Sequence, residues 1–488
     1  TSADHRKALL LGQREPRRDT SLSLSRSYDP ILDPLLLKVK QAQDYFLLVG
    51  PPGTGKTSRA LRFMVEEELA NKSSAVLLLA YTNRAVDEIC DMLVDAGIDF
   101  LRVGSELSCA PQFETHLIPN AVGEKPLLNE MKATLVNARV VVGTTSTLQA
   151  RPFIFGLKHF TMALVDESSQ ILEPNIIGLL AGHSGTTGKT ASDICDIDKF
   201  VLVGDYKQLP AVVRQNDVQS TVSEPELHEI CLTNCKNSLF ERLINIEKKS
   251  GRTSFMGVLQ LQGRMHPDIA EFPTKEFYFD EQLRPVPLRH QLATTIDYKL
   301  PSEDSVDDML KQHRVLFIAS GFCRRPDISD KVNTIEAHIV ADLLRRIHRF
   351  ADTGFDPDKT VGVIVPYRNQ IAMIRREIEK MGIADLEKIS IDTVERYQGS
   401  QRDVIIYSFT IQQRYQLDFL TANVFEENGH TIDRKLNVAL TRARKQLVLV
   451  GNPSILAENV VFKRIIDYSK QKKCYIREYE PTITEKNI

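Results

Sequence analysis

The sequence lacks any long apolar run. No stretch reaches the roughly 18 residues that a helix needs to cross a bilayer, so no membrane span is predicted. The polar start, Thr1 to Lys7, has no apolar signal-peptide core behind it, and we expect a protein that is not secreted. The first residue is Thr rather than Met, so we expect a fragment or a processed form.

Neither sign of charge is in excess. Lys and Arg number 62 against 64 Asp and Glu, a net charge of -2, which argues against bulk attraction to polyanions but leaves room for a local cationic stripe. The seven scattered cysteines fit reduced thiols in the cytoplasm, or in the nucleus of a eukaryote. His228, Cys231 and Cys235 have a spacing that could ligate zinc, but no fourth ligand lies nearby, and we expect no structural metal.

The chain also has no short-period repeat and no low-complexity segment, and its 488 residues suit two or three domains. Short apolar runs alternate with turns and helical stretches, which is typical of parallel strands buried on both faces. The runs are Tyr45 to Val49, Ala75 to Leu79, Arg139 to Val142, Met162 to Val165, Phe200 to Val203, Val315 to Ile318, Val361 to Val365, Val404 to Tyr407 and Leu447 to Val450.

This pattern predicts two successive α/β domains. The expected segments are a lead-in at 1–44, a first domain at 45–215, a helical junction at 216–257, a second domain at 258–475 and a tail at 476–488. Helices are expected at Thr57 to Ala70, Thr334 to Arg349 and Gln370 to Met381. Polar stretches at Gly182 to Asp198 and Pro301 to Asp308 are expected to be surface insertions.

A phosphate-binding loop follows the first apolar run. The pattern G-x-x-x-x-G-K-[ST] is met by Gly50, Pro51, Pro52, Gly53, Thr54, Gly55, Lys56 and Thr57. Glycines let backbone N–H groups turn inward around phosphate oxygens, Lys56 reaches the β and γ phosphates, and the Thr57 hydroxyl ligates Mg²⁺. The strand before and the helix after are the context that the pattern requires. The sequence therefore predicts ATP and Mg²⁺ as ligands.

Two further segments follow expected strands and suit hydrolysis. Asp166 is placed to hold Mg²⁺ through its water shell, and Glu167 would polarise the attacking water as general base. Gln208, in the segment GDYKQLP, could contact both the γ-phosphate and that water. Taken alone, each segment could equally be a polar turn; after a phosphate-binding loop they predict an ATPase site.

Taken together, the motifs resemble superfamily 1B helicases, of the group that contains the nonsense-mediated-decay RNA helicase and the flap-processing nuclease–helicase. The resemblance runs from Tyr45 to Asn452 and implies two RecA-like domains with an ATP cleft between them. Its motifs, in family order, are GPPGTGKT at 50–57, VDESSQ at 165–170, GDYKQLP at 204–210, LQGRMHP at 261–267, DTVERYQG at 392–399 and LNVALTRAR at 436–444.

The resemblance gives two arginines of the second domain a role. It implies that Arg264 and Arg442 reach the γ-phosphate as arginine fingers, with Gly399 also at the nucleotide. Arg444 is an alternative finger or an arginine on a helix surface. Hydrolysis would remove the charge that draws the domains together. ATP hydrolysis would thereby be coupled to movement of the domains.

The chain departs from the family pattern at several positions. Gly263 replaces the aromatic residue of QYRMHP, Gln401 replaces a Glu that follows motif V, and Ala211 replaces a second proline. No clear adenine-reading glutamine precedes the phosphate-binding loop. Gln13, Gln41 and Gln43 are the candidates, each with a surface residue as the alternative.

The resemblance also implies a path for single-stranded nucleic acid, DNA or RNA. Its residues would be Thr82, Asn83, Thr144 and Thr145 in the first domain and Pro366, Tyr367, Arg368 and Thr393 in the second. Small polar residues in loops after strands can hold phosphates without reading sequence. The alternative is that each is an ordinary capping or turn residue.

The motifs predict an ATP-dependent helicase that moves along single strands, and the resemblance implies 5′ to 3′ travel. The alternative is an ATP-switched clamp on nucleic acid or on a protein, without unwinding. The family often carries accessory domains, so we expect that such a domain could precede Thr1.

Overall fold

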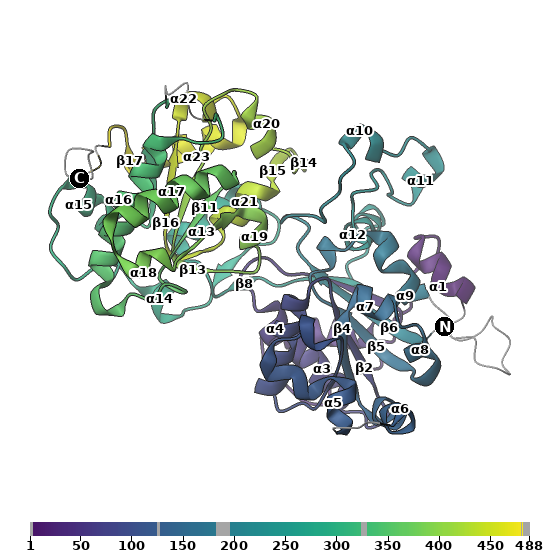
Figure 1. The fold of residues 1–488 in the computed structure, drawn as a ribbon. Coiled ribbons are helices and arrows are strands. Elements are labelled where there is room, and N and C mark those ends of the chain that lie inside the picture. Colours follow the sequence, from purple (N-terminus) through teal and green to yellow (C-terminus); the bar gives the residue numbers. More distant parts are fainter. Residues whose placement is uncertain (1–2, 124–126, 182–195, 324–328, 480, 482–488) are drawn as a thin grey trace. The chain divides into compact units, whose positions relative to one another are not determined.

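A computed structural model of the chain describes residues 3–123, 127–181, 196–323, 329–479 and 481 (Figure 1). It divides into two compact units. Unit 1 comprises Thr1–Tyr206 and Pro210–Leu259, and unit 2 comprises Lys207–Leu209 and Gln260–Ile488. Three residues in the middle of the chain therefore belong to the second unit, although the chain on either side of them belongs to the first.

Unit 1 contains a seven-stranded sheet in the order β3-β4-β2-β5-β6-β1-β7, in which all neighbouring strands are parallel. The strands are β1 (Tyr45–Val49), β2 (Val76–Ala80), β3 (Leu101–Val103), β4 (Val140–Thr144), β5 (Phe160–Val165), β6 (Ile197–Gly204) and β7 (Met256–Val258). Every residue of β1, β2 and β4 is buried, as expected of strands covered on both faces.

The helices of unit 1 lie before and between these strands in the chain (purple to teal in Figure 1). They are α1 (Ala3–Leu10), α2 (Asp33–Gln41), η1 (Lys56–Leu61), α3 (Arg62–Leu69), α4 (Asn83–Asp95), η2 (Glu106–Ser108), η3 (Pro111–His116), α5 (Ile118–Val122), α6 (Leu128–Asn137), α7 (Thr145–Gln149), α8 (Phe153–Leu157), η4 (Ser168–Gln170), η5 (Glu173–Asn175), α9 (Ile177–Ala181), α10 (Asp217–Ser220), α11 (Pro225–Glu229) and α12 (Leu239–Lys249).

The expected lead-in at 1–44 and junction at 216–257 both lie within unit 1. In the lead-in, the fully buried Arg6 donates to the carbonyls of Ile197 and Asp198, each at 2.7 Å, at the start of β6. In the junction, β7 pairs with β1 and extends the sheet. Neither segment therefore stands apart from the first α/β unit.

Unit 2 contains a six-stranded sheet in the order β12-β11-β13-β16-β10-β17, again with all neighbours parallel. Its strands are β10 (Val315–Ala319), β11 (Val361–Val365), β12 (Ser390–Thr393), β13 (Arg402–Ser408), β16 (Ala443–Gly451) and β17 (Tyr475–Ile476). Two small sheets accompany it, built from β8 (Leu261–Gln262), β9 (Arg284–Pro285), β14 (Val424–Glu427) and β15 (His430–Asp433).

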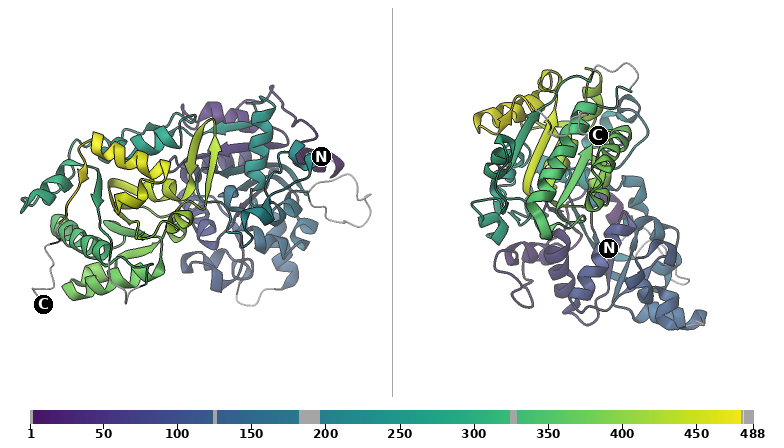
Figure 2. Two further views of the ribbon diagram at one scale, coloured as in Figure 1. Left: turned by 90° about the horizontal axis from the view of Figure 1, so that it is seen from above. Right: turned by 60° about the vertical axis from the view of Figure 1, so that its left-hand side comes forward.

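Helices cover both faces of the unit 2 sheet. They are α13 (Pro267–Glu276), α14 (Arg289–Leu292), α15 (Ser305–Gln312), α16 (Thr334–Ala351), η6 (Asp352–Gly354), α17 (Arg368–Met381), α18 (Ala384–Glu387), α19 (Val394–Tyr397), α20 (Gln416–Leu420), α21 (Arg434–Leu440), α22 (Pro453–Leu456) and α23 (Val460–Gln471). The α16 and α17 helices pack side by side on one face (green in Figure 2).

Alternate residues of each strand supply two separate cores in unit 2. Leu316 and Ile318 of β10 pack with α16 and α17, whereas Phe317 packs with α13, α21 and α23. This alternation is the period-2 geometry of a strand buried on both faces. Seven of the nine apolar runs fall within strands, and the other two begin one residue before β2 and β4, which confirms the prediction of two parallel α/β units.

The expected surface insertion at Pro301 to Asp308 is corrected by the structure. The α15 helix begins at Ser305, and Asp307 is fully buried, with its carboxylate 2.7 Å from Arg346. Most of the other expected insertion, Gly182 to Asp198, lies outside the described residues. Among the helices that the structure describes, none is both long enough and apolar enough to cross a bilayer.

One carboxyl group is fully buried at the carboxyl edge of the unit 2 sheet. Glu336 of α16 accepts from Ser408 Oγ at 2.6 Å, Thr410 N at 2.8 Å and Ser320 Oγ at 2.9 Å. Burial raises the pKa of Glu336 to about 7, although these hydrogen bonds favour the ionised form and lower it. The group therefore joins three segments, namely the ends of β10 and β13 and the start of α16.

We expect Glu336→Gln to alter how stability depends on pH. Between pH 4.5 and 7 the unfolded chain loses this proton while the folded chain keeps it, so ionisation favours unfolding as pH rises. The raised pKa allows a loss of at most about 3 kcal/mol in the free energy of unfolding. Glutamine cannot ionise, so the variant should lose less stability from pH 5 to 7.5 in urea titrations. Identical losses in both proteins would contradict the raised pKa.

Candidate nucleotide site and nucleic-acid interface

The phosphate-binding loop joins β1 to η1 in unit 1. Gly53 and Gly55 have φ of 73° and 74°, in the left-handed region that side chains disfavour. Lys56 Nζ donates to the Gly50 carbonyl at 2.8 Å, and a Cβ on Gly50 would lie 2.3 Å from Lys56 Cγ. The loop therefore folds closely around the lysine, and the helix that follows turns its N-terminus, the positive end of its dipole, to the loop.

The two candidate magnesium ligands are in direct contact. Thr57 Oγ1 donates to Asp166 Oδ2 at 2.7 Å, across the sheet from β1 to the end of β5. Burial and then the charge of Glu167 raise the pKa of Asp166 to about 6, although Lys56 lowers it. Hydroxyl and carboxylate oxygens are the ligands that Mg²⁺ prefers, and a cation here would offset the cost of burying the charge. The residues fit Mg²⁺ bound with a triphosphate.

Glu167 follows Asp166 with a left-handed backbone, at φ 50°. Such a conformation is uncommon for a residue with a side chain and clusters at functional sites. Its N–H donates to Asp166 Oδ1 at 2.8 Å, and its carboxylate accepts from Gln170 Nε2 at 2.9 Å. The half-buried carboxylate is therefore oriented by a neighbour, as a general base requires.

The end of β6 packs closely on the segment after β5. A Cβ on Gly204 would lie 2.9 Å from the Ser169 nitrogen, so only glycine fits without displacing the backbone. Ser169 Oγ accepts from Asp205 N at 3.2 Å, and Ser168 Oγ donates to the Val203 carbonyl at 2.8 Å. The acidic pair and the segment leading to Gln208 are therefore held together.

Gln208 and Arg442 meet within unit 2. Arg442 Nη2 donates to Gln208 Oε1 at 2.7 Å, and Arg442 Nε donates to the Val438 carbonyl at 3.1 Å. Arg442 is 2% exposed and directly precedes β16, so it lies at the amino edge of the unit 2 sheet. The structure thus brings together two of the residues expected to read the γ-phosphate.

Arg264 lies close to the same place. Its Nε donates to Gln401 Oε1 at 2.9 Å and its Nη1 to the carbonyl of Thr441, the residue before Arg442, at 3.4 Å. Gln401, which departs from the family pattern, thus holds an expected arginine finger. Gly399 is exposed and has φ of 83°.

Arg444 lies apart from this pair. It belongs to β16, and its guanidinium is 3.2 Å from the carboxylate of Asp403. The expected alternative, an arginine on a helix surface, is wrong about the helix, because Arg444 lies on a strand. Its partly exposed ion pair with Asp403 nevertheless fits a surface arginine better than a finger.

Sequence reasoning missed Lys207, which fixes the position of Gln208. Lys207 is fully buried, and its Nζ lies 2.7 Å from Glu281 and 2.9 Å from Glu427. The ammonium also lies 4.6 Å from the centre of the Phe279 ring. These contacts explain why residues 207–209 belong to unit 2. The only sequence signal was a lysine inside a motif, with nothing to show which carboxylates it meets.

In unit 1 the expected nucleic-acid residues follow two neighbouring strands. Ala80 pairs with Thr144, so the segments after β2 and β4 share one stretch of the carboxyl edge. Thr82 and Asn83 are exposed, whereas Thr144 and Thr145 are buried. Thr82 and Thr144 also cap α4 and α7, accepting at 3.2 Å and 3.1 Å from the backbone N–H groups three residues on. The expected capping role is therefore present at both threonines.

In unit 2 the expected residues also follow neighbouring strands. Val365 pairs with Thr393, so Pro366, Tyr367 and Arg368 share the carboxyl edge with Thr393. Arg368 is exposed, Pro366 is buried, and Tyr367 and Thr393 are half-buried. The Tyr367 ring stacks on Phe419, with centroids 5.1 Å apart and planes 22° from parallel. An exposed arginine beside an aromatic stack suits a backbone phosphate and a base.

Two of the candidate adenine-reading glutamines hold the lead-in together instead. Gln41 is buried, donates to the Leu22 carbonyl at 3.1 Å and accepts from Arg18 at 2.6 Å. Gln43 donates to the Gln41 carbonyl at 3.2 Å. Gln13 is exposed. Both bonded side chains are therefore used in local structure.

The candidate zinc residues do not form a cluster. His228 Nε2 lies 2.6 Å from the carbonyl of Val222, six residues before it in the chain. Across the ranges that the structure describes, no three His, Cys, Asp or Glu side chains gather in a metal-binding arrangement.

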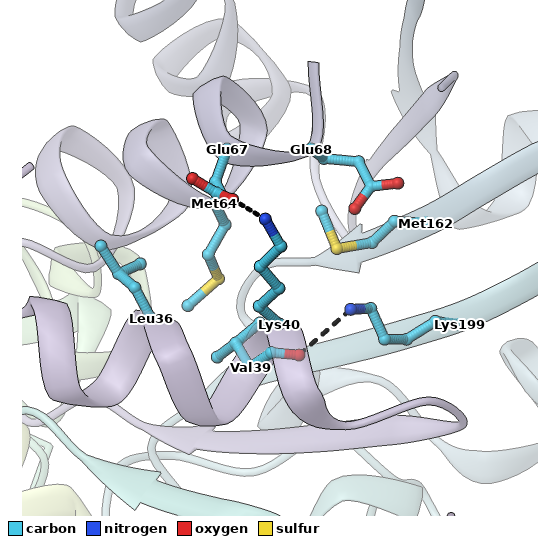
Figure 3. Close-up of a pocket in the computed structure, with 8 residues that line it drawn as sticks. All are labelled: Leu36, Val39, Lys40, Met64, Glu67, Glu68, Met162 and Lys199. Carbon is cyan, nitrogen blue, oxygen red and sulfur yellow. Dashed lines mark hydrogen bonds and ion pairs between the residues drawn. The ribbon is translucent and has the colours of Figure 1, made fainter. Parts of the chain in front are cut away.

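Figure 3 shows a cavity of about 30 Å³ between α2, α3 and the first residues of β5 and β6. Lys40 forms an ion pair with Glu67 there, and Lys199 Nζ donates to the Val39 carbonyl at 3.1 Å. It opens at the amino ends of strands whose carboxyl ends lead to Asp166 and Gln208. The cavity suits only one or two water molecules, and it is not the nucleotide site.

Comparison with known proteins covers most of the chain. Two family models, each described as an AAA domain, match residues 34–133 and 125–216, and residues 235–454. The helicase/nuclease JHS1 of Arabidopsis thaliana is 28% identical over 90% of this chain and 29% of its own length. The DNA polymerase alpha-associated DNA helicase A of Saccharomyces cerevisiae is 26% identical over 85% of this chain and 63% of its own length.

A regulator of nonsense transcripts 1 homolog from Neurospora crassa is 27% identical over 88% of this chain and 38% of its own length. The chain thus spans between 29% and 63% of the length of these three relatives. Among solved structures, an Arterivirus nonstructural protein 10 helicase in complex with DNA matches with a TM-score of 0.39 and 14% identity, over 84% of this chain and 60% of the other.

The two parallel sheets and the phosphate-binding loop define the class of the protein, a P-loop NTPase with tandem RecA-like units. The family models and the relatives define the family more narrowly. The chain belongs to the superfamily 1 helicases, in the group that includes the regulator of nonsense transcripts 1 homologs and the DNA replication helicase/nucleases.

Proposed function

We propose that this protein is an ATP-dependent helicase that moves along single-stranded nucleic acid. The observation that carries the proposal is the 2.7 Å hydrogen bond between Thr57 of the phosphate-binding loop and Asp166, which follows β5. It joins the two residues that a magnesium–triphosphate complex needs, beside a lysine for the phosphates and an oriented glutamate for the water. The names of two relatives, a DNA replication ATP-dependent helicase/nuclease and a DNA polymerase alpha-associated DNA helicase, support the same function.

Lys56 and the backbone N–H groups of the loop would hold the β and γ phosphates, and Thr57 and Asp166 would hold Mg²⁺. When bound, the ion would neutralise charge on the phosphates and orient them. Glu167 accepts a proton from the attacking water, and Gln208 orients that water. Each of these side chains already has a defined hydrogen-bond partner.

We further propose that Arg264 and Arg442 complete the site from unit 2 as arginine fingers. Their guanidiniums would stabilise the negative charge that develops on the transferred phosphoryl group. The phosphate-binding loop alone would not neutralise all of this charge. Both are held at or beside the amino edge of the unit 2 sheet, Arg264 by Gln401 and Arg442 by Gln208. Loss of the γ-phosphate would deprive the two arginines of their anionic partner. The attraction that draws the two units together over ATP would then end.

Single-stranded nucleic acid would run along the carboxyl edges of the two sheets. The proposed contacts are Thr82, Asn83, Thr144 and Thr145 in unit 1 and Pro366, Tyr367, Arg368 and Thr393 in unit 2. Exposed Thr82, Asn83 and Arg368 are the direct phosphate contacts, and buried Thr144, Thr145 and Pro366 shape the loops around them. We propose 5′ to 3′ travel, as the family resemblance implies.

The function is tested by ATP turnover with and without matched single-stranded DNA and RNA oligonucleotides. We expect a severalfold rise in turnover with one or both, because a translocase hydrolyses ATP productively only when its track is bound. No stimulation by either oligonucleotide would overturn the proposal. Duplexes with a 5′ overhang should be unwound, and duplexes with a 3′ overhang should not. Stimulation without unwinding would instead favour the ATP-switched clamp.

We expect Lys56→Ala to abolish turnover, because the phosphates lose their cation. Glu167→Gln should bind ATP with near-normal affinity but hydrolyse it at least about 100 times more slowly, because the general base is lost. Turnover and the binding of a fluorescent ATP analogue measure the two effects separately. Glu226→Gln, an exposed carboxylate on α11, is the control and should behave as wild type. Near-normal turnover by Glu167→Gln would show that another group is the base.

Arg442→Ala should lower turnover on the order of a thousandfold at saturating ATP if this arginine is a finger. Arg444→Ala is the matched control, because it removes an arginine two residues away whose partner is Asp403. We expect it to cost less than about tenfold in turnover, since exposed ion pairs contribute little. Equal losses in the two variants, with folding checked by circular dichroism, would contradict the assignment.

A further inference from the structure

Two short helices of unit 2 connect opposite edges of its sheet. The α19 helix follows Thr393, at the carboxyl end of β12, and the chain after it reaches Gln401, at the amino end of β13. The α21 helix leads to Arg442, at the amino end of β16. The two helices pack against each other. Each helix therefore connects the carboxyl edge, where nucleic acid is proposed to bind, to the amino edge, at or beside which Arg264 and Arg442 lie.

An ion pair links the beginnings of these two helices. Lys435 of α21 and Glu395 of α19 have Nζ and Oε1 atoms 3.0 Å apart. The lysine side chain is 5% exposed, whereas that of the glutamate is 42% exposed. Lys435 Nζ also donates to the Phe419 carbonyl at 3.3 Å. Because these partners surround the buried ammonium of Lys435, its position is fixed. Since Lys435 belongs to α21 and Glu395 to α19, the ion pair also fixes the two helices relative to each other.

The same lysine supports the aromatic stack of the proposed nucleic-acid path. Its Nζ lies 4.0 Å from the centre of the Phe419 ring, and the Tyr367 ring stacks on Phe419 with centroids 5.1 Å apart. Lys435, Phe419 and Tyr367 thus form consecutive contacts from α21 to the carboxyl edge. Phe419 remains 43% exposed, so the stack lies at the surface, where a base could reach it.

At their other ends, the two helices lead to the proposed arginine fingers. Gln401, after α19, accepts from Arg264 at 2.9 Å. Arg442, after α21, donates to Gln208 at 2.7 Å. A displacement of either helix by a few tenths of an ångström would change these hydrogen bonds, since their geometry is strict. The seven residues of α21 span about 10 Å, a short and fully buried link.

We propose that Lys435 is a positioning residue through which bound single-stranded nucleic acid sets the arginines of unit 2 for hydrolysis. The inference rests on the proposed function. A strand bound at Tyr367 and Thr393 would fix the Phe419 stack and the start of α19. Both contact Lys435, and Lys435 holds the start of α21. Nucleic-acid stimulation of turnover therefore depends on this lysine, whereas basal turnover does not.

The test is Lys435→Met, which keeps the length and apolar stem of the side chain but removes the ammonium. We expect basal turnover within about twofold of wild type. The ratio of stimulated to basal turnover, at saturating oligonucleotide, should fall from the severalfold value of the wild type to about one, as expected when an energetic coupling between sites is lost. The oligonucleotide dissociation constant is measured alongside, so that weaker binding is not read as weaker stimulation.

Matched variants separate positioning from folding. Lys435→Arg keeps a cation and should restore at least half of the stimulation ratio. Glu395→Gln removes the partly exposed partner and should lower the ratio as Lys435→Met does, with little risk to the buried core. Lys380→Met, which removes a Lys–Glu pair at the far end of α17, is the control and should leave the ratio unchanged. An equal loss in that control would overturn the inference.

A second mutation tests whether the contacts act in series. Phe419→Leu should lower the ratio, and adding it to Lys435→Met should lower the ratio no further, because both act on one chain of contacts. Additive losses would overturn the inference. If the wild type itself shows no stimulation, the proposed function fails. If the wild type is stimulated and Lys435→Met keeps its ratio, only the role of Lys435 fails.

Discussion

Parallel strand pairing is the constraint on which the rest of this structure depends. In a parallel sheet all carboxyl ends lie along one edge, so residues far apart in the chain become neighbours there. In unit 1 this edge is divided between two tasks. The segments after β4 and β2 carry the proposed nucleic-acid contacts, and those after β5 and β1 carry the proposed nucleotide residues. Strand order alone would therefore place the two proposed sites near each other on one edge without merging them.

Unit 2 uses a different arrangement of the same architecture. Its proposed nucleic-acid residues lie at the carboxyl edge, as in unit 1, but Arg264 and Arg442 lie at or beside the amino edge. The two tasks are therefore separated by the height of the sheet. Strands such as β16 span this height, and so do helices α19 and α21 with the chain that follows them. Since these helices lead directly to Gln401 and Arg442, we propose that their contacts serve the mechanism as well as stability.

The sequence predicted what depends on local pattern. The apolar runs located nine strands, because strands buried on both faces leave unbroken hydrophobic stretches. Short or partly exposed strands such as β3, β7 and β12 have too few apolar residues to leave this signal. Residues 50–57 were found because their chemistry requires a fixed spacing. The lead-in and junction could not be assigned to unit 1, because long-range contacts such as that of Arg6 with β6 leave no local pattern.

Inside the candidate site, too, long-range contacts leave no local sequence pattern. Motifs therefore do not reveal the residues that only position others. Gln208 could be singled out because its amide suits a phosphate, but its position is set by Lys207, whose partners Glu281 and Glu427 lie far along the chain. A buried ion pair contributes little net stability, because desolvation offsets attraction, yet removing one partner is costly. Such a pair therefore acts mainly to specify position. Lys207 and Lys435 are both buried lysines with carboxylate partners, although Glu395, the partner of Lys435, is partly exposed. We propose that each positions residues of the proposed sites and takes no part in the chemistry itself.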